Sequence, residues 1–139
     1  MALAASMNRE YTSVDELNIP LAASAAVVYK GSLVAVDTTA SGYGSVAGDT
    51  ADQRVVGIAL EEKDNSAGAA GGLSVLVRRG KIEKFTAASA DQAWVGNLVY
   101  VVDDTTVALA ATTTNDIVVG MVVKVDSATV VWVDMNVRA

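Results

Sequence analysis

Residues 31–37 read Gly-Ser-Leu-Val-Ala-Val-Asp, and residues 96–103 read Gly-Asn-Leu-Val-Tyr-Val-Val-Asp. After a loop, each phrase is followed by Val-Val-Gly and three apolar residues, at 55–60 in the first case and at 118–123 in the second. β-Branched residues dominate all four segments, and such residues favour strands. The chain therefore contains the same strand-forming phrase twice.

A third apolar element follows each phrase, at 73–77 and at 129–133. The order of the elements is kept while the loops between them differ in length, which is typical of an internal repeat. We expect two similar halves, at about 27–79 and 94–135, inside one β-domain that covers 22–139. The repeat accounts for most of the strongly patterned residues and leaves few for chemistry.

Composition narrows the functional classes. A chain of 139 residues predicts one domain, and this one contains no Cys and no His. Disulfides and thiolate metal sites are therefore excluded, and the commonest general base and zinc ligand are missing. Hydrophobic residues make up 52% of the chain, whereas aromatic residues make up only 5%. This Val- and Ala-rich content suits strands and small-residue turns.

The apolar runs are short and separated by turn residues. Only 89–93 resemble a helical turn, so we predict an all-β fold, a compact β-barrel or sandwich of about nine short strands. The expected strands lie at 25–29, 32–36, 54–60, 73–78, 81–85, 98–102, 106–109, 117–125 and 129–135.

Two glycines interrupt these strands at matched positions, Gly57 and Gly120. Glycine inside a strand costs about 0.5–1 kcal/mol relative to alanine, so a bulge or a close backbone approach is expected at both. Neither glycine opens a helix after a Gly-rich turn, which argues against a phosphate loop.

The strand predicted at 117–125 is apolar on both faces. Strand side chains alternate, and a strand with one buried face shows a cleaner alternation of apolar and polar residues. We therefore expect a second cover, supplied by another subunit; the alternative is a sandwich whose outer face tolerates Val and Ala. One face is expected to hold Ile117, Val119, Met121, Val123 and Val125.

Residues 1–21 are expected to form an N-terminal arm, which ends beside the only proline, Pro20. Residues 13–16 fit a capping box, so one helical turn is expected near Val14. An isolated short helix is unstable, so the arm must dock on a partner, dock on its own domain or stay loose. Apolar anchors recur along it at Leu3, Met7, Tyr11, Val14, Leu17 and Ile19.

The formal net charge is −6, from 10 basic and 16 acidic residues, which disfavours nucleic acid as a partner. Four basic residues cluster within seven positions. A solvated or paired strand edge explains them, and contact with an acidic protein surface is the alternative. They are Arg78, Arg79, Lys81 and Lys84.

Segments that would mark a membrane or secreted protein are not found in the sequence. No stretch reaches the ~18 apolar residues of a membrane span, and residues 1–9 do not resemble a signal peptide. The chain is expected to be made and used in the cytosol, or in something assembled there.

Candidate catalytic groups are few. Ser–Lys pairs occur near Ser32 and Ser127, at strand ends, and adjacent carboxylates occur at 61–62 and 103–104. Adjacent strand residues point to opposite faces, so these carboxylates do not predict a glycosidase pair. We predict no enzyme activity and no cofactor. A weak surface Ca²⁺ site at 103–104 or at 49–52 stays open.

The two tryptophans are the remaining candidates for binding. Trp132 lies in the last predicted strand and is expected in a core or a subunit contact. Trp94 precedes the turn at Gly96 and is expected to cap a barrel end or to anchor an interface. A pair of tryptophans on a β-face also suits stacking on sugar rings.

The order of these motifs resembles the small capsid decoration, or cement, proteins of tailed bacteriophages. The resemblance covers about 22–136 and is carried by the residues at 27–36, 54–60, 75–80, 95–101 and 119–121. It implies a compact β-domain, commonly trimeric, on the outer surface of the capsid, where it clamps neighbouring copies of the major capsid protein. Trimer is implied by the resemblance alone, and a dimer would cover the strands equally well.

The resulting expectation is a capsid decoration protein of the virion, assembled in the host cytoplasm, with the major capsid protein and itself as partners. No nucleic acid, membrane or metal is expected. The alternative is a carbohydrate- or receptor-binding β-module, such as a head-fibre base. Candidate capsid or subunit contacts are Leu3, Met7, Tyr11, Leu17, Arg78, Arg79, Lys81, Trp94 and Trp132.

Overall fold

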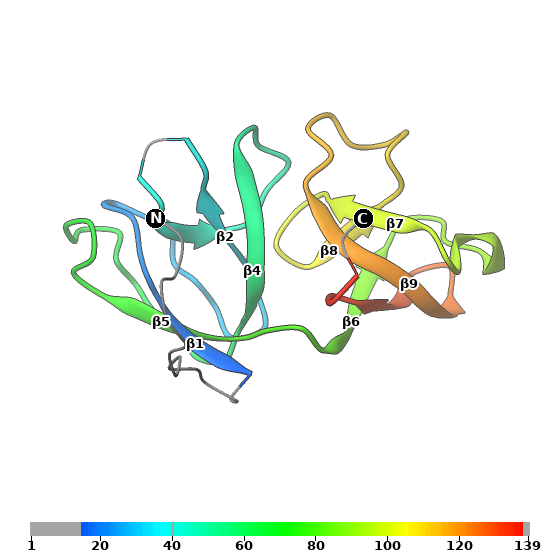
Figure 1. Cartoon of the computed structure of the whole chain (residues 1–139), viewed down its shortest axis with the longest axis horizontal. Helices are drawn as coiled ribbons and strands as arrows, with labels where there is room; N and C mark the ends of the chain where they lie inside the picture. The colour runs from blue at the N-terminus through cyan, green and yellow to red at the C-terminus, as the bar shows by residue number, and fades with distance from the viewer. Residues whose placement is uncertain (1–14, 40, 138–139) are drawn as a thin grey trace, which may run out of the picture.

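The computed structural model describes residues 15–39 and 41–137, and this part of the chain is all-β, as predicted. It holds ten strands and one 3-10 turn, η1 (Gln92–Trp94), and these form two units side by side (Figure 1). The first unit contains β1 (Glu16–Pro20), β2 (Leu33–Asp37), β3 (Gly44–Val46), β4 (Gln53–Ala59) and β5 (Ser74–Arg78). The second unit contains β6 (Ile82–Ala87), β7 (Leu98–Val101), β8 (Thr106–Ala108), β9 (Val118–Ser127) and β10 (Val130–Asp134).

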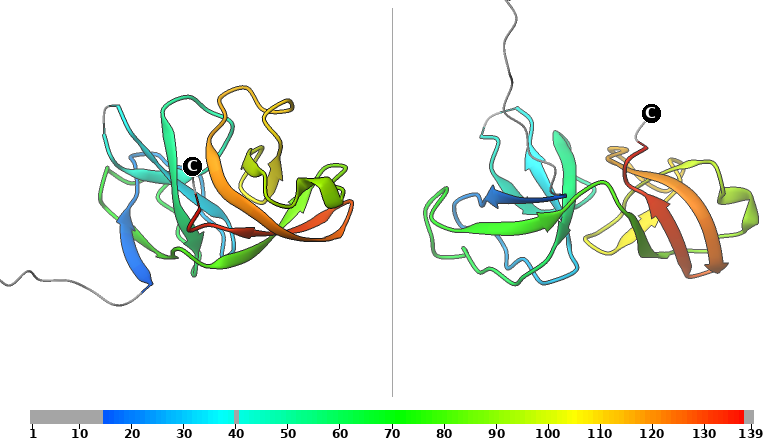
Figure 2. Two further views of the ribbon diagram at one scale, coloured as in Figure 1. Left: turned by 45° about the vertical axis from the view of Figure 1, so that its right-hand side comes forward. Right: turned by 60° about the horizontal axis from the view of Figure 1, so that its bottom comes forward.

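Both units have the same topology. The first is a sheet in the order β1-β5-β4-β2-β3, and the second is a closed barrel in the order β10-β6-β8-β7-β9. The second unit closes where β6 pairs in parallel with β8, and the first has a parallel bridge between Leu21 and Gly44 at the corresponding place. Strand by strand, β1 to β5 correspond to β6 to β10. The two similar halves are therefore two copies of one five-stranded unit (Figure 2).

The correspondence extends to single residue pairs. In each unit the second strand pairs with the fourth through two residues, then shifts register by a bulge. The matched pairs are Leu33↔Ile58 with Val34↔Gly57 in the first unit, and Leu98↔Met121 with Val99↔Gly120 in the second. The bulges expected at Gly57 and Gly120 are thus present, and both glycines lie against the last strand of their unit.

The turn before each second strand is also repeated. Gly31 and Gly96 have φ values of 94° and 88°, a left-handed conformation that glycine adopts without steric cost. The Gly31 N–H donates to the Ala59 carbonyl at 2.8 Å, and the Gly96 N–H donates to the Val122 carbonyl at 2.8 Å. The repeated Gly-x-Leu-Val phrase therefore encodes a turn as well as a strand.

The first unit begins inside the segment predicted as an arm. Glu16–Pro20 is a strand paired with β5, so the helical turn expected near Val14 does not continue into residues 15–20. The helical turn predicted from the capping box is wrong for residues 15–20, because pairing with β5 supplies tertiary hydrogen bonds and buries Ile19. Residues 1–14, with Leu3, Met7 and Tyr11, lie outside the described residues.

Two hydrophobic clusters hold the molecule together. One lies inside the first unit and includes Leu21, Val34 and Val77. The other fills the barrel of the second unit and continues onto the outward face of β2 and β4, where Leu33 and Val55 belong to it. A second cover for β2 and β4 is thus supplied by the other half of the same chain. The cover that was expected from another subunit concerned the strand at 117–125, and it stays a prediction.

The alternation of inward and outward side chains along β9 differs from the prediction. Two register shifts against β10 and one against β7 interrupt the period of two. Val119 and Val122 are consequently buried, whereas Met121 and Val123 are half-buried. The expected common face from Ile117 to Val125 is wrong because each bulge turns the following side chains to the opposite face.

Candidate functional site

In the part of the chain that the structure describes, several carboxylates accept hydrogen bonds from backbone N–H groups. Within 15–39 and 41–137 there is no group of three or more acidic residues placed to hold a metal ion. Asp103 accepts hydrogen bonds from the N–H groups of Thr105 and Thr106, which organise a turn. Burial alone would raise the pKa of Asp103, but these hydrogen bonds outweigh it and lower the pKa. Glu61 accepts from the Leu76 N–H, so this carboxylate also supports the backbone.

The Ser–Lys candidates are also engaged in the fold. Ser32 Oγ donates to Asp104 Oδ2 at 2.9 Å, so its partner is a carboxylate of the other unit and not the lysine of a Ser–Lys pair. Ser127 Oγ lies 3.3 Å from Thr129 Oγ1, and Lys124 pairs with Asp126 at 3.2 Å. These contacts favour structural roles for both serines.

Asp104 joins the second unit to the first. Its carboxylate accepts from Ser32, and its carbonyl accepts from the Leu33 N–H at 2.7 Å. Leu33 is the first residue of β2, so this pair of hydrogen bonds fixes the turn before β8 against the start of a first-unit strand. Side-chain and backbone contacts together define one end of the junction between the units.

Asp49 joins the units at the other end of the junction. Its carboxylate accepts from the N–H groups of Thr114 and Asn115, both at 2.8 Å, and the Asn115 side chain donates back to the Asp49 carbonyl. The two backbone hydrogen bonds are the main reason that the pKa of Asp49 lies below its ordinary value. An ionised carboxylate therefore ties the loop before β4 to the loop before β9.

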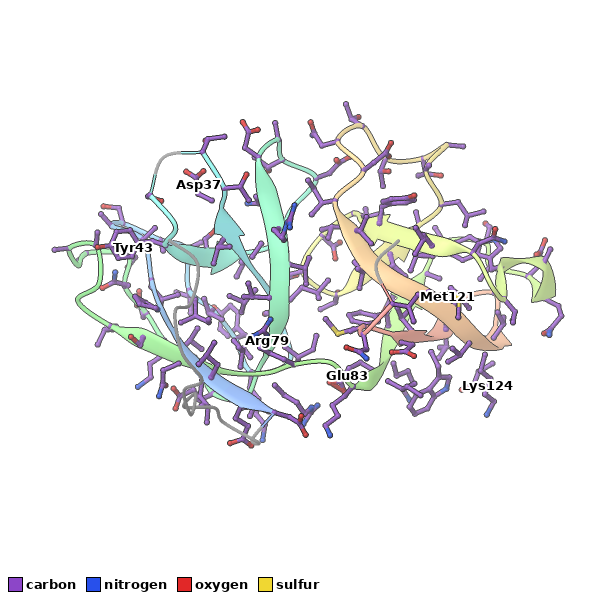
Figure 3. All side chains as sticks on the ribbon, viewed as in Figure 1. Asp37, Tyr43, Arg79, Glu83, Met121 and Lys124 are labelled. Atoms are coloured by element: carbon purple, nitrogen blue, oxygen red, sulfur yellow. The ribbon has the colours of Figure 1, made fainter. Side chains whose placement is uncertain are left out.

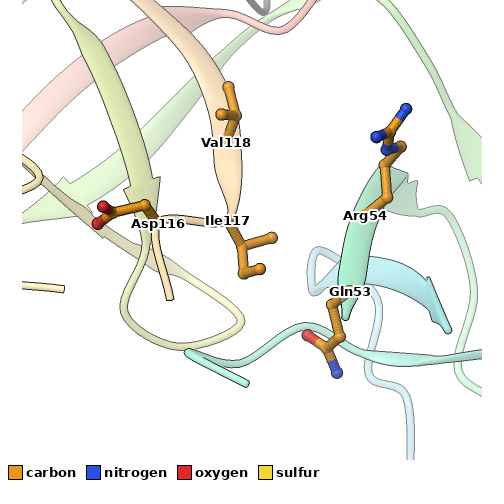
Figure 4. A pocket seen from close by; sticks show the side chains of 5 residues that line it. All are labelled: Gln53, Arg54, Asp116, Ile117 and Val118. Carbon is orange, nitrogen blue, oxygen red and sulfur yellow. The ribbon is translucent and has the colours of Figure 1, made fainter. Parts of the chain in front are cut away.

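A groove runs between the two units beside this contact. Gln53 and Arg54 line it from β4, and Asp116, Ile117 and Val118 line it from the start of β9 (Figure 4). Its volume is about 250 Å³. Its lining combines one arginine, one aspartate and one glutamine with two aliphatic residues, and Asp116 is the one carboxylate among them. The groove lies along the boundary between the two repeated units.

The connection between the units carries the predicted basic cluster. Arg78 Nε and Nη2 donate to the two carboxylate oxygens of Glu83, both at 2.9 Å, and hydrogen bonding to Glu83 raises the pKa of Arg78. Lys81 pairs with Asp15 at 2.5 Å. Arg79 is exposed, and it lies with Glu83 beside the connection between the units (Figure 3). These pairings match the paired-edge interpretation of the cluster.

The second tryptophan lies on the outer face of the second unit. Trp132 is half-buried, its indole N–H donates to Asp126 Oδ2 at 2.8 Å, and Lys84 Nζ lies 5.9 Å from its ring centroid. The hydrogen bond from the indole is the first cause of the lowered pKa of Asp126. The expectation of a core position for Trp132 is wrong, because β10 directs Val131 and Val133 inward and Trp132 outward.

Trp94 belongs to the core. Only 7% of it is exposed, and η1 places it in the barrel cluster with Val122, next to the turn at Gly96. Capping of the barrel was one of its two expected roles. With so little accessible surface, Trp94 is left out of the contact surface proposed below.

The remaining predicted site residues meet at one corner of the molecule. Leu17 is 43% exposed in β1, and its neighbour Glu16 pairs across the sheet with Arg78. The Arg79 N–H donates to the Asp15 carbonyl, and Lys81 pairs with the Asp15 carboxylate. We call this surface the linker corner; it consists of Leu17, Arg78, Arg79 and Lys81.

Sequence reasoning missed the residues of the junction. Asp49 was noted only as a possible Ca²⁺ ligand, Asp104 as that or as one of two adjacent carboxylates, and Ser32 only as a candidate nucleophile. Each contacts a partner more than 60 positions away, and nothing local in the sequence indicates such partners. The repeat itself is the one available signal, since two fused units need residues that fix one against the other.

Comparison with known proteins gives no information on function, so function is inferred from the fold and the contacts described above. No protein-family model, curated protein or solved structure matches the chain. Within the residues described, none of the helical structure is long and apolar enough to cross a membrane.

Proposed function

We propose that the chain is a capsid decoration, or cement, protein of a tailed bacteriophage, which binds the outer surface of the head and stabilises contacts between neighbouring major capsid proteins. The observation that carries the proposal is the fusion of two five-stranded units through a shared hydrophobic cluster. Such a body suits a rigid clamp, and its described serines and carboxylates hold turns and the junction. The sequence resemblance supplies the specific class.

Charge supports a position on the outside of the head. A net charge of −6 opposes association with the packaged nucleic acid. The basic residues of the linker corner give a local surface that attracts an acidic patch on a capsid protein. In this proposal the protein is no enzyme and needs no cofactor.

The linker corner and the N-terminal segment provide the contact surface. Leu17 and Ile82 are 43% and 53% exposed. Leu17 follows Glu16, which pairs with Arg78 across the sheet, and Ile82 follows Lys81, so apolar and basic residues are neighbours at this corner. Residues 1–14 add the apolar anchors Leu3, Met7 and Tyr11. An extended segment can add a strand to a sheet edge of the capsid protein and gain main-chain hydrogen bonds.

Self-association strengthens such a contact. Ordering an extended segment costs about 1–2 kcal/mol per residue, which apolar anchors must offset. A homotrimer carries three segments, and binding of the first raises the effective concentration of the others. A dimer would act in the same way with lower avidity.

The test is co-sedimentation of the purified protein with undecorated capsids of the matching phage. The full chain is expected to bind, and a variant that starts at Asp15 is expected to fold but to bind poorly. The truncation has to stop there, because removal of 16–20 would strip β1 from the sheet and uncover Val75 and Val77. Normal decoration by the shortened chain would remove the N-terminal segment from the mechanism.

A charge-reversal variant tests the corner. Arg79→Glu with Lys81→Glu is expected to weaken capsid binding, whereas Lys30→Glu, at an exposed lysine outside the corner, is expected to leave it unchanged. If the full chain does not bind capsids at all, the proposed function fails.

The second candidate function is a carbohydrate- or receptor-binding β-module. The half-buried Trp132 on an outer sheet face favours it, since an accessible indole can stack on a sugar ring. Lys84 already lies over this ring, which counts against a free stacking face. Titration with glycans would change the Trp132 fluorescence under this alternative and leave it unchanged under the cement proposal.

A further inference from the structure

The outward face of β2 and β4 is buried at four positions. Leu33, Ala35, Val55 and Ile58 point away from the interior of their own unit, yet their exposed fractions are 0%, 0%, 1% and 7%. They belong to the cluster that fills the second unit. The junction is therefore a contact between the β2–β4 face of one unit and an end of the next.

The second unit has the same face, and it is not buried to the same extent. The register places Leu98, Tyr100, Val118 and Met121 at the positions of Leu33, Ala35, Val55 and Ile58, respectively. All four residues of the second unit are half-buried. Val118 borders the groove between the units, and Met121 of β9 is labelled in Figure 3.

A shallow hollow of about 560 Å³ lies over part of this face. Its lining includes Leu98 and Tyr100 of β7 and Leu109 after β8. Outer strand positions that face only solvent are usually polar, as the exposed Lys84 of β6 and Lys124 of β9 are in this barrel. The apolar residues of the β7–β9 face, Leu98, Tyr100, Leu109 and Met121, thus have the character of a contact surface.

The second-unit end that contacts the β2–β4 face has a counterpart in the first unit. In the junction, the second unit offers the turn around Asp104 to Ser32 and Leu33. The first unit has the same turn: Asp37 Oδ1 accepts from the Thr39 N–H and hydroxyl, as Asp103 Oδ1 accepts from those of Thr105. Thr38 therefore corresponds to Asp104, and it is exposed.

We propose that the β7–β9 face binds the first-unit end of a second copy of the chain, repeating between molecules the contact that joins the two units within one. The occupant is a second copy because the contact already exists between two such units. Among the described residues, Leu98, Tyr100 and Met121 of the face are half-buried, and Thr38 and Arg54 of the matching end are exposed. Contacts of this head-to-tail kind close into a ring or continue as a filament.

The side chains that differ between the two contacts remain compatible. Where the second unit offers Ile117 to the junction, the register places Arg54 on the first unit. Tyr100 takes the place of Ala35 on the opposing face, and a tyrosine ring packs favourably against a guanidinium group. The contact between molecules is therefore more polar than the junction, as suits subunits that fold before they assemble.

The first experiment measures mass by light scattering in the absence of capsids. The wild-type protein is expected to form a discrete oligomer, and Tyr100→Asp is expected to shift it to the monomer. Tyr29→Asp is the matched control, since Tyr29 is 58% exposed and lies outside the β7–β9 face and the matching end. Circular dichroism checks that both variants fold.

The second experiment identifies the surfaces and does not depend on how Tyr100→Asp folds. The chain has no Cys, so paired cysteines report single contacts. Asn97→Cys with Thr38→Cys places thiols at the positions that correspond to Ser32 and Asp104. A short thiol cross-linker is expected to give a ladder of covalent multimers on a denaturing gel, whereas either single variant stops at dimers. Ser32→Cys with Asp104→Cys is the internal reference and is expected to cross-link within one chain.

The proposal deepens the self-association within the proposed function, and its failure is separable because no capsid is present. A monomeric wild-type protein overturns it. So does an oligomer in which Asn97→Cys with Thr38→Cys gives no ladder while the reference pair cross-links. A ladder together with an oligomer supports it, and dissociation of folded Tyr100→Asp supports it independently.

Discussion

Gly57 and Gly120 occupy the same place in the two units, and neither position has room for a side chain. A Cβ on Gly57 would come within 2.5 Å of the Arg78 carbonyl oxygen, and a Cβ on Gly120 would collide with that of Asp134. Both glycines let the fourth strand of a unit bend closely against the fifth. The shared constraint explains why Val-Val-Gly recurs in the sequence.

Alanine at either glycine is expected to destabilise the protein by about 1–3 kcal/mol, because carbonyl oxygens of a paired strand cannot move away as a flexible side chain can. Gly48→Ala is the control, since its Cβ would meet only the Thr50 hydroxyl at 3.4 Å. Denaturant unfolding of the three variants measures the difference. Equal stability of Gly57→Ala and Gly48→Ala would show that β4 relaxes and that the close approach is unimportant.

The repeat could be predicted from sequence because the same residues set both turn and register. Gly31 and Leu33 recur as Gly96 and Leu98, and the pattern needs no knowledge of the partner strand. The strand that begins the first unit was missed, since of Glu16–Pro20 only Ile19 is buried. Its counterpart β6 has two buried residues and was recognised.

Contacts distant in sequence could not be predicted. The two faces of β9 were misassigned because a bulge is specified by pairing with neighbouring strands, and alternation alone does not show where it falls. Trp132 was expected in a core or in a subunit contact. The core position is wrong because β10 directs Val131 and Val133 inward and Trp132 outward. In the sequence, Asp49 and Asp104 look like ordinary turn residues. Their contacts become visible only when the two units are placed against each other.

The Asp49 contact predicts a dependence of stability on pH. The pKa of Asp49 is lower in the folded chain than its ordinary value of 3.8, so its ionised form favours folding. This contribution is complete above pH 3.8 and is lost as the pH falls through the lower, folded-state pKa. Asp49→Asn is therefore expected to be less stable than wild type at neutral pH, and the gap is expected to narrow below pH 3.8.

Urea unfolding from pH 7 down to the acid limit measures that gap. Asp52→Asn is the control, because Asp52 is an exposed aspartate on the same loop. Hydrogen exchange at the Thr114 and Asn115 amides gives a local reading: both should exchange faster in Asp49→Asn. A gap that stays constant through acid pH would contradict the assigned pKa.

The pair of Arg78 and Glu83 is expected to couple the ends of β5 and β6. Its two parallel hydrogen bonds are both 2.9 Å long, but the Arg78 side chain is 39% exposed, so solvent screens the attraction. A double-mutant cycle with Arg78→Ala and Glu83→Ala should give a coupling of about 0.5–1 kcal/mol, smaller in high salt. Arg78→Lys should lose much of it, since lysine lacks the planar fork. A coupling near zero at low salt would mean that the connection is held by backbone pairing alone.

The two tryptophans are expected to differ sharply in their contribution to folding. Trp94→Ala leaves a cavity in the barrel cluster and should cost about 3–5 kcal/mol. Trp132→Ala removes one hydrogen bond to Asp126 and a cation–π contact with Lys84, and should cost about 1–2 kcal/mol. Single-tryptophan variants made with phenylalanine give a second reading, because Trp94 alone should emit at shorter wavelength than Trp132 alone. If Trp132→Ala proves the more damaging change, the outer face of β10 must be covered, and the obvious cover would be another subunit.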